Sequence, residues 1–153
     1  MLKSRSPVAS GYYVRPLDRD SAERLVARLL QFTADQDWEN WTAHNVLANR
    51  PRKWELSLLA SDPDEPVGYA IVSAPAPDNH HLHHIAVAPD TRGRGIGEQL
   101  MGALMSRAQS ESCFLTLKVH AVNTRAIDFY CRLGFQILSS VDEQLLMSIS
   151  PAR

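Results

Sequence analysis

The sequence predicts a single α/β domain, and three observations support this prediction. The chain has 153 residues, which suits one domain with a sizeable hydrophobic core. Strand-like apolar runs alternate with apolar patterns of helical period, and no repeat, linker or low-complexity segment interrupts them. In the stretch His80–Ala103, a strand-like run, a turn rich in glycine and arginine, and a helical pattern follow one another directly. We therefore expect one folded unit over residues 12–153, preceded by a flexible N-terminal tail over residues 1–11.

Seven segments are predicted to be strands, because aliphatic, β-branched and aromatic residues gather in them between turn residues. They are, in order, Tyr12–Val14, Trp54–Ala60, Val67–Ser73, Leu82–Val87, Cys113–Val119, Phe135–Ser139 and Leu145–Ile149. Two proline-rich loops, over residues 61–66 and 74–79, separate the second, third and fourth of these strands.

Four segments carry apolar residues at helical spacing and are predicted to be helices. They are Leu25–Phe32 with a cap from Asp18, Asp20 or Ser21, Trp41–Asn49, the segment from Gly97 to about Ser110, and Ala126–Leu133. We expect Pro51 to stop the second helix. Gly134 suits the left-handed conformation that commonly ends a helix, and we expect it to end the fourth.

The overall composition excludes several functional classes. The formal net charge is -1, so the chain lacks the broad basic excess of a protein that binds nucleic acid through phosphates. No segment approaches about 18 consecutive apolar residues, and the short polar N-terminus lacks the apolar core of a signal peptide. Cys113 and Cys131 lie in apolar patterns without metal-type spacing, as reduced buried thiols do. These features predict a cytoplasmic protein that binds neither nucleic acid nor a membrane.

The turn Thr91–Gly97 has the features of a phosphate-binding loop. It follows a strand and opens a helix, so successive backbone N–H groups and the helix dipole favour an anion there. Its glycines let the backbone approach a ligand closely, and Arg92 and Arg94 concentrate positive charge. The turn matches neither the P-loop nor the G-x-G-x-x-G pattern. A surface turn without a ligand is the alternative interpretation.

Two blocks of the sequence resemble one enzyme family. Arg92-x-x-Gly95-x-Gly97, placed after Ile85-Ala86-Val87, is similar to the acyl-coenzyme A pyrophosphate loop of the GNAT N-acetyltransferases. The segment Asn123–Phe135, which reads NTRAIDFYCRLGF, resembles the second conserved block of the same enzymes. The resemblance implies the GNAT fold, a mixed and mostly antiparallel central sheet of six to seven strands flanked by about four helices.

The resemblance also implies direct transfer of an acetyl or other acyl group from acetyl-coenzyme A to a primary amine. The residues that it assigns to coenzyme binding are Ile85, Ala86, Val87, Arg92, Gly93, Arg94, Gly95, Ile96, Gly97, Asn123, Ala126, Phe129 and Tyr130. The backbone of Ile85 and Val87 would hold the pantetheine arm, and an amide there would polarise the thioester carbonyl. Tyr130 would protonate the departing thiolate. The family needs no metal.

The attacking amine must be neutral, so the reaction needs a base or a water relay to one. Many members of the family carry a glutamate where this chain has His81, within the run His80-His81-Leu82-His83-His84. Strand alternation predicts one face with His81, His83, Ile85 and Val87, and the opposite face with His80, Leu82 and His84.

His81 and His83 are therefore the candidate catalytic pair, and His120 from the following strand is a third candidate near the acceptor. Two alternatives stay open for the histidine run. Its side chains could shape the structure or the substrate site, or a same-face pair could chelate a metal.

Acidic residues near the expected acceptor site suggest a cationic amine. Asp35, Asp37 and Glu39 surround Trp38 between the first two predicted helices. A solvated acidic loop with one packed tryptophan is the alternative. We expect a cationic small-molecule acceptor, with a peptide or protein N-terminus or lysine as the second candidate. A non-catalytic acyl-coenzyme A sensor is the candidate from another class, and a homodimer is expected only by analogy with the family.

Overall fold

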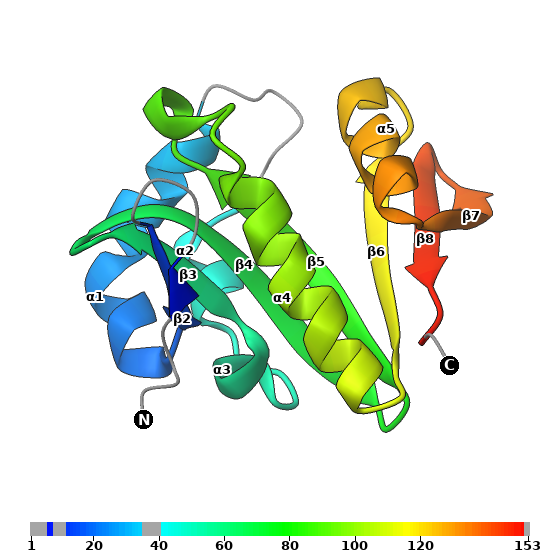
Figure 1. Ribbon diagram of the computed structural model, residues 1–153, viewed down its shortest axis with the longest axis horizontal. Helices are drawn as coiled ribbons and strands as arrows, with labels where there is room; N and C mark the ends of the chain where they lie inside the picture. The colour runs from blue at the N-terminus through cyan, green and yellow to red at the C-terminus, as the bar shows by residue number, and fades with distance from the viewer. Residues whose placement is uncertain (1–5, 8–11, 35–40, 152–153) are drawn as a thin grey trace.

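A computed structural model describes residues 6–7, 12–34 and 41–151, and within them one eight-stranded sheet forms the centre of the molecule (Figure 1). Its strand order is β1-β2-β3-β4-β5-β6-β8-β7. The strands are β1 (Ser6–Pro7), β2 (Tyr13–Pro16), β3 (Leu58–Asp62), β4 (Glu65–Ala76), β5 (Asn79–Val87), β6 (Phe114–His120), β7 (Gln136–Val141) and β8 (Gln144–Ile149). The pairing of β5 with β6 is parallel and all the others are antiparallel. The predicted mixed, mostly antiparallel sheet is confirmed, with the two-residue β1 as an additional strand.

Five α-helices surround the sheet in the described part of the chain. They are α1 (Arg19–Leu30), α2 (Ala43–Leu47), α3 (Lys53–Leu56), α4 (Ile96–Ser110) and α5 (Thr124–Leu133). Side chains cap three of them: Asp18, one of the predicted candidates, caps α1, Thr42 caps α2 and Asn123 caps α5. Gly134 ends α5 with a φ of 108°, which confirms the predicted left-handed residue.

Different helices cover the two faces of the sheet (Figure 1). On one face α4 contributes Met101 and Leu104 to a cluster with strand residues, and α5 contributes the buried Tyr130 to the same cluster. On the other face α1 packs against strand residues through Leu29, and α2 does so through Val46. The sheet therefore separates an α4–α5 side from an α1–α2 side.

The two central parallel strands separate part-way along their length. β5 pairs with β6 only from Asn79 opposite Phe114 to Leu82 opposite Leu117. β6 continues from Lys118 to His120 paired only with β8, and β5 continues to Val87 paired only with β4. This separation opens the sheet between its two halves, as Figure 1 shows between β5 and β6.

A β-bulge lies in β5 at the point of separation. Ile71 pairs with His84 and the next residue of β4, Val72, pairs with Leu82, so His83 is one residue too many. The bulge reverses the alternation of side chains. Leu82 before it and Ile85 after it therefore both pack on the α4 side. The predicted face that joined His81 and His83 to Ile85 and Val87 is therefore wrong.

The predicted strand over Trp54–Ala60 is also wrong in its first half, because Lys53–Leu56 forms the short helix α3. Lys53 is fully buried, and its ammonium group donates to the carbonyls of Val46 (2.6 Å), Ala48 (2.5 Å) and Asn45 (3.3 Å). The end of α2 thus receives a buried donor from α3. A long-range contact overrides the local strand preference here.

The two ends of the sheet bear on the remaining expectations. Of the predicted tail, Ser6 and Pro7 form β1, and the other residues lie outside those described. β7 at the opposite edge exposes the large hydrophobic residues Ile137, Leu138 and Val141. The homodimer stays a prediction.

Within the described residues, no helix is both long enough and apolar enough to cross a membrane.

Replacing Lys53 with Met should destabilise the fold by about 2–3 kcal/mol, because three buried carbonyl groups would lose their donor. Urea unfolding of the two proteins measures the difference. Lys118→Met is the matched control, since Lys118 is exposed and its loss should cost less than about 0.5 kcal/mol. Equal effects of the two substitutions would contradict this account of α3.

Candidate active site

A groove of about 660 Å³ occupies the space between the separated strands. It brings together residues that are up to 111 positions apart in the sequence. Its lining consists of Thr33, Trp41, Asn45, Leu82, His83, His84, Ile85, Ala86, Val87, Arg92, Gly97, Leu117, Lys118, Val119, His120, Asn123, Arg125, Ala126, Phe129, Tyr130 and Gln144. Nine of the thirteen residues predicted to bind the coenzyme, together with His83 and His120, thus line one groove.

The edge of β5 beyond the bulge offers backbone hydrogen-bonding groups to this groove. The amide of Ala88 donates to the carbonyl of Val67, which fixes that residue toward β4. Since alternate residues of a strand direct their backbone groups to opposite edges, Ile85 and Val87 direct theirs away from β4. No strand pairs with β5 on that side beyond Leu82. An extended ligand could therefore take the place of a strand along Ile85–Val87.

The loop that follows β5 has the conformation that close approach of an anion requires. Gly93 and Gly95 have φ values of 83° and 84°, in the left-handed region that favours glycine. Gly95 is also the residue before α4, where no side chain caps the helix. The first backbone N–H groups of this 15-residue helix have no intrahelical acceptor, so they suit a phosphate group. Glycine, backbone and helix end thus fit a pyrophosphate.

The two arginine side chains of the loop contact protein groups. Arg92 donates from Nε to the Val87 carbonyl (3.1 Å) and from a terminal nitrogen to the Phe32 carbonyl (2.7 Å). Arg94 donates to the hydroxyl of Tyr12 (2.8 Å) and is absent from the groove lining. Gly93, Gly95 and Ile96 are also absent from that lining, and Ile96 is part of the core. The loop therefore presents its backbone, and the arginine side chains brace it.

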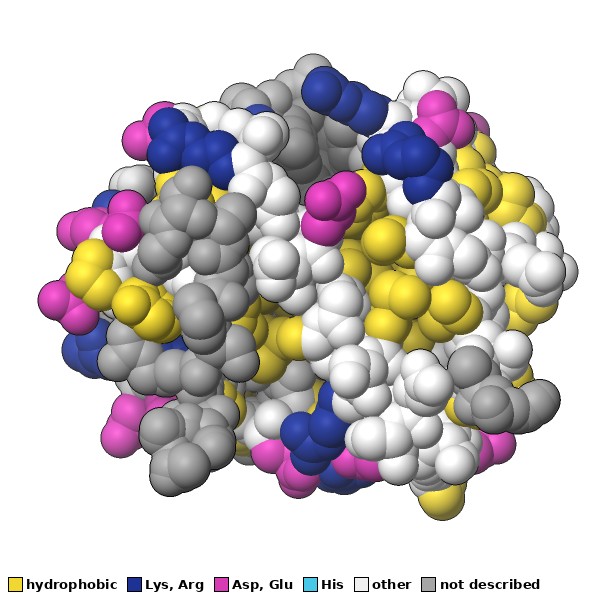
Figure 2. All heavy atoms as spheres, viewed as in Figure 1, with side chains coloured by type: hydrophobic (Ala, Val, Ile, Leu, Met, Phe, Trp, Pro, Cys, Tyr) yellow, Lys and Arg dark blue, Asp and Glu magenta, His cyan; other side chains and the backbone are white. Residues whose placement is uncertain are grey.

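The α5 side of the groove carries the second predicted block. Asn123 caps the helix by accepting a hydrogen bond from the Ala126 amide (3.2 Å), so its side-chain oxygen has a structural role. Phe129 and Tyr130 form a tilted ring pair, and Tyr130 is 7% exposed. On the α4–α5 face, hydrophobic side chains gather over and beside α5 (Figure 2). Tyr130 thus both lines the groove and belongs to the hydrophobic cluster on the α4–α5 side.

The histidines of β5 divide between two environments. His83 lines the groove and its Nε2 lies 2.7 Å from the Ser73 hydroxyl, whereas His81 does not line it. His81 binds the Thr116 hydroxyl on β6 through Nδ1 at 2.6 Å, and its ring meets that of His83 edge-on. The structure keeps the predicted pair together and brings only His83 to the groove.

Both rings favour the neutral state. Burial, together with the nearby charges of His81, Arg50 and Lys53, lowers the pKa of His83 to about 4. Burial also lowers the pKa of His81, assisted by the charges of Lys118 and Arg50. At pH 7 these imidazoles are uncharged, and His83 is a weak proton acceptor.

The groove also contains residues that the sequence did not single out, and two of them lie at or near α2. Trp41 stacks on His84 with ring centroids 4.5 Å apart, and Asn45 lies on the same short helix. Lys118 and Gln144 come from β6 and β8. The sequence did contain a signal for Lys118. It lies two residues before His120 on the same strand, so alternation places both side chains on one face.

The predicted acidic rim is only partly described. Asp35, Asp37, Trp38 and Glu39 lie outside the described residues. Glu143, on the turn between β7 and β8, approaches His120 at 3.7 Å. His120 lines the groove as predicted.

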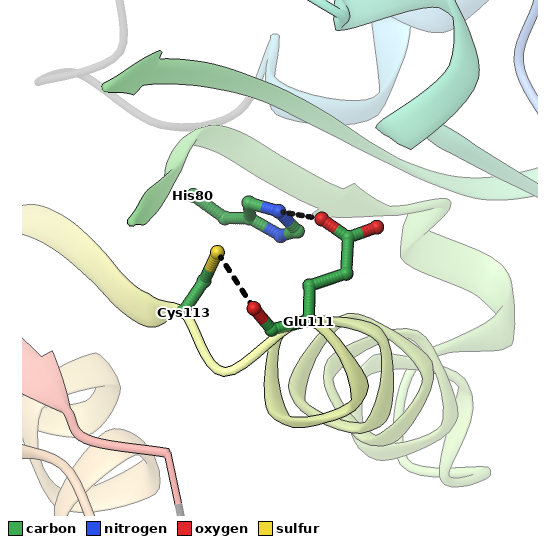
Figure 3. Close-up of side chains that lie close together, drawn as sticks. All are labelled: His80, Glu111 and Cys113. Atoms are coloured by element: carbon green, nitrogen blue, oxygen red, sulfur yellow. Dashed lines mark hydrogen bonds and ion pairs between the residues drawn. The ribbon is translucent and has the colours of Figure 1, made fainter. Parts of the chain in front are cut away.

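A second cluster of reactive side chains lies at the other end of β5 (Figure 3). The ring of His80 lies between the thiol of Cys113 and the carboxylate of Glu111, and possible ligand atoms of the three lie within 4.8 Å of one another. Cys113 is far from His80 in sequence, so the spacing gave no sign of this cluster. Ion pairs with Arg52 (2.8 Å) and Arg107 (2.7 Å) neutralise Glu111 and hold its pKa far below the usual range. Two guanidinium groups disfavour a cation, so the cluster is interpreted as a structural ion-pair network.

Comparison with known proteins identifies the family of this fold and site. Residues 19–135 match the model of the acetyltransferase (GNAT) family. The chain belongs to this family. A peptidyl-lysine N-acetyltransferase, YjaB of Salmonella typhimurium, is 33% identical over 90 residues, which cover 58% of this chain and 56% of that protein. The N-alpha-acetyltransferase RimI of Mycobacterium tuberculosis is 30% identical over 139 residues, 89% of this chain and 83% of RimI.

Solved structures of GNAT proteins share the architecture. The PaiA N-acetyltransferase of Thermoplasma acidophilum, solved with coenzyme A, superposes with a TM-score of 0.75 at 16% identity and covers 91% of this chain and 98% of its own. At that identity the likeness concerns the fold. The chain spans about half of the length of YjaB.

His83 should make the fold sensitive to acid. Its pKa of about 4 lies below the ordinary value of 6.5, so the unfolded chain binds more protons between these values. Stability should therefore fall as the pH falls from about 6.5 to 4, and His83→Gln should remove on the order of 2 kcal/mol of that loss. Urea unfolding between pH 7 and pH 4.5 measures it. Exposed His44→Gln is the control, and the same pH dependence in both variants would disprove the assignment.

Proposed function

We propose that this protein is an N-acetyltransferase that moves an acetyl group from acetyl-coenzyme A directly to a primary amine. The observation that carries the proposal is the continuous path from the open edge of β5, at Ile85–Val87, into the loop before α4. This path suits the pantetheine arm and pyrophosphate of coenzyme A, which the related PaiA protein binds. When bound, acetyl-coenzyme A supplies the activated acyl thioester.

The chain's residues supply the coenzyme site in three parts. The outward backbone groups of Ile85 and Val87 would hold the amide-containing arm, and the Val87 amide would stabilise charge on the thioester oxygen. The N–H groups at the start of α4 would hold the pyrophosphate. Gly97 and Phe129 both line the groove. A Cβ added at Gly97 would lie 3.8 Å from the Phe129 ring, at ordinary contact distance, so the two residues are neighbours there.

The two reactants would meet from opposite faces of the sheet. Tyr130 belongs to the hydrophobic cluster on the α4–α5 side, whereas Trp41 and Asn45 come from the α1–α2 side. The coenzyme would therefore approach beside α5, and the amine would enter beside α2. Such an arrangement allows direct attack by the amine, with Tyr130 placed to protonate the thiolate.

His83 is the histidine that can act on the acceptor in this arrangement. As a neutral ring it would accept a hydrogen bond from the amine or from a relay water. His81 contacts His83 and Thr116, so we assign it a positioning role. His120 stays a candidate contact to the acceptor.

Two acceptor classes stay in the proposal. The cationic small molecule predicted from the acidic segment depends on residues outside the described part. A peptide acceptor is the second class, which the names of YjaB and RimI favour.

Two measurements test the function: thermal shift with acetyl-coenzyme A, and thiol release with a panel of amines. Stabilisation without turnover on any acceptor would indicate a coenzyme sensor, and no stabilisation would disprove the coenzyme site.

Tyr130→Phe should lower kcat by about 100-fold or more while the coenzyme still raises the melting temperature, because only the phenolic proton is lost. Thiol release at saturating acceptor measures this loss. Tyr13→Phe on β2, outside the groove lining, is the matched control and should retain full activity. Normal turnover by Tyr130→Phe would eliminate the general-acid assignment.

A further inference from the structure

The acceptor end of the groove carries positive charge. Among the described lining residues, the charged ones are Arg92, Lys118 and Arg125, and none is acidic. Arg92 is held by two backbone carbonyls, and Arg125 belongs to α5 on the coenzyme side. Lys118 is therefore the charge that faces an acceptor most directly.

Lys118 lies at the point where the sheet opens. It is the first residue of β6 beyond the last pair with β5, Leu117 opposite Leu82. The side chains of Leu117 and Val119 are buried in the α4–α5 cluster, so alternation directs Lys118 to the α1–α2 side. That is the side from which the amine enters in the proposed function.

The contacts of Lys118 leave its ammonium group available to a ligand. Its residue is exposed, and within the described ranges it forms no ion pair or side-chain hydrogen bond. It lies close enough to His81 for its charge to affect that ring. The carboxylate of Glu143, on the turn between β7 and β8, approaches His120 at 3.7 Å.

Among the described residues, the other charged groups that act on the His83 ring have the same sign. Arg50 and Lys53 both act on the His83 ring, and the ammonium of Lys53 is occupied by three backbone carbonyls. Glu55 and Glu111 are paired with Arg52 and Arg107 at the far end of the sheet. A ligand with only positive charges would meet repulsion here, and a carboxylate would meet attraction.

We propose that the acceptor is a small α-amino acid-like molecule whose carboxylate pairs with Lys118 while its amine faces the thioester. This proposal rests on the proposed acetyltransferase function and specifies its substrate class. It replaces the expectation of a purely cationic acceptor with a zwitterion, which presents both an amine and an anion.

The reaction balances with the groups present. The ammonium of the acceptor first loses one proton to solvent through a relay water that is hydrogen-bonded to the neutral His83 ring. The nitrogen then forms a bond to the thioester carbonyl carbon, the carbon–sulfur bond breaks, and the second nitrogen proton is released. The departing thiolate takes a proton from Tyr130, which solvent restores. The carboxylate is unchanged, so its pairing with Lys118 persists from substrate to product.

Matched acceptors test the proposal on the full chain. Thiol release is measured with L-amino acids, with the corresponding L-amino acid amides, and with spermidine as a purely cationic amine. The amino acids should show kcat/KM values about 10- to 100-fold above those of their amides, the range expected of one charge-assisted hydrogen bond. Equal or higher values for the amides or spermidine would overturn the proposal.

Variants of Lys118 identify the residue responsible. Lys118→Met should raise KM for the amino acids by about 10- to 100-fold and leave KM for the amides unchanged. The ratio of kcat/KM for amino acids to kcat/KM for amides should then fall to about one. Lys118→Arg should retain most of the preference, because it retains the charge. Arg132→Met, an exposed change on α5 outside the groove lining, is the control and should leave the ratio unchanged. An unchanged ratio in Lys118→Met would overturn the assignment.

A binding experiment separates failure of this proposal from failure of the function. With coenzyme A present, N-acetyl amino acids and N-acetyl amino acid amides are titrated by calorimetry as product probes. The carboxylate forms should bind at least 10-fold more tightly, and Lys118→Met should remove the difference. Turnover without this preference overturns the substrate class alone. Preferential binding without turnover on any amine supports the carboxylate site and overturns the transferase function.

Discussion

The parting of β5 from β6 is the constraint on which the rest of the site depends. A sheet normally pairs every backbone N–H and C=O along its inner strands, and a buried group left without a partner costs about 1–3 kcal/mol. Beyond Leu82 and Leu117 this pairing is given up. The separated strands stay in place because β5 stays paired with β4 on both sides of the bulge and β6 stays paired with β8. The open edge is thus maintained by its neighbours, and the ligand groups it offers are fixed before any ligand arrives.

The bulge at His83 determines which side chains surround that opening. Without the extra residue, His84 would point to the α4 side, because it would alternate in step with Leu82. With it, His84 stacks on Trp41, and Ile85 and Val87 pack on α4 while their backbone groups face the groove. One additional residue therefore supplies both a polar acceptor wall and an apolar coenzyme wall.

Local signals in the sequence were sufficient for much of this fold. Caps, the glycine turn and Gly134 depend on neighbours a few residues away, and the structure confirms them. The bulge escaped prediction because strict alternation assumes an unbroken ladder, and only the pairing with β4 reveals the extra residue. The helix at Lys53–Leu56 and the meeting of Cys113 with His80 depend on contacts between distant segments. Residue types thus predicted the lining of the groove beside α5 better than the lining beside α2, which residues of α2, β5, β6 and β8 form together.

Charge in the acceptor region also bears on how the amine becomes a nucleophile. His83, with a pKa of about 4, cannot take a proton readily from an amine of high basicity. An ordinary lysine amine, with a pKa of about 10.4, would need a shift of about 3.4 units to be half neutral at pH 7, or roughly 5 kcal/mol. The α-amine at the N-terminus of a peptide, with a pKa of about 7.7–8.0, needs a shift of about one unit, and the α-amine of a free amino acid lies between these two cases because its own carboxylate raises its pKa. The positive charges of Lys118 and Arg50 lower the pKa of a nearby ammonium group, as they lower that of His81. A site with weak bases and cationic walls therefore suits α-amines, and the same charges that attract a carboxylate also help to release the proton from the amine beside it.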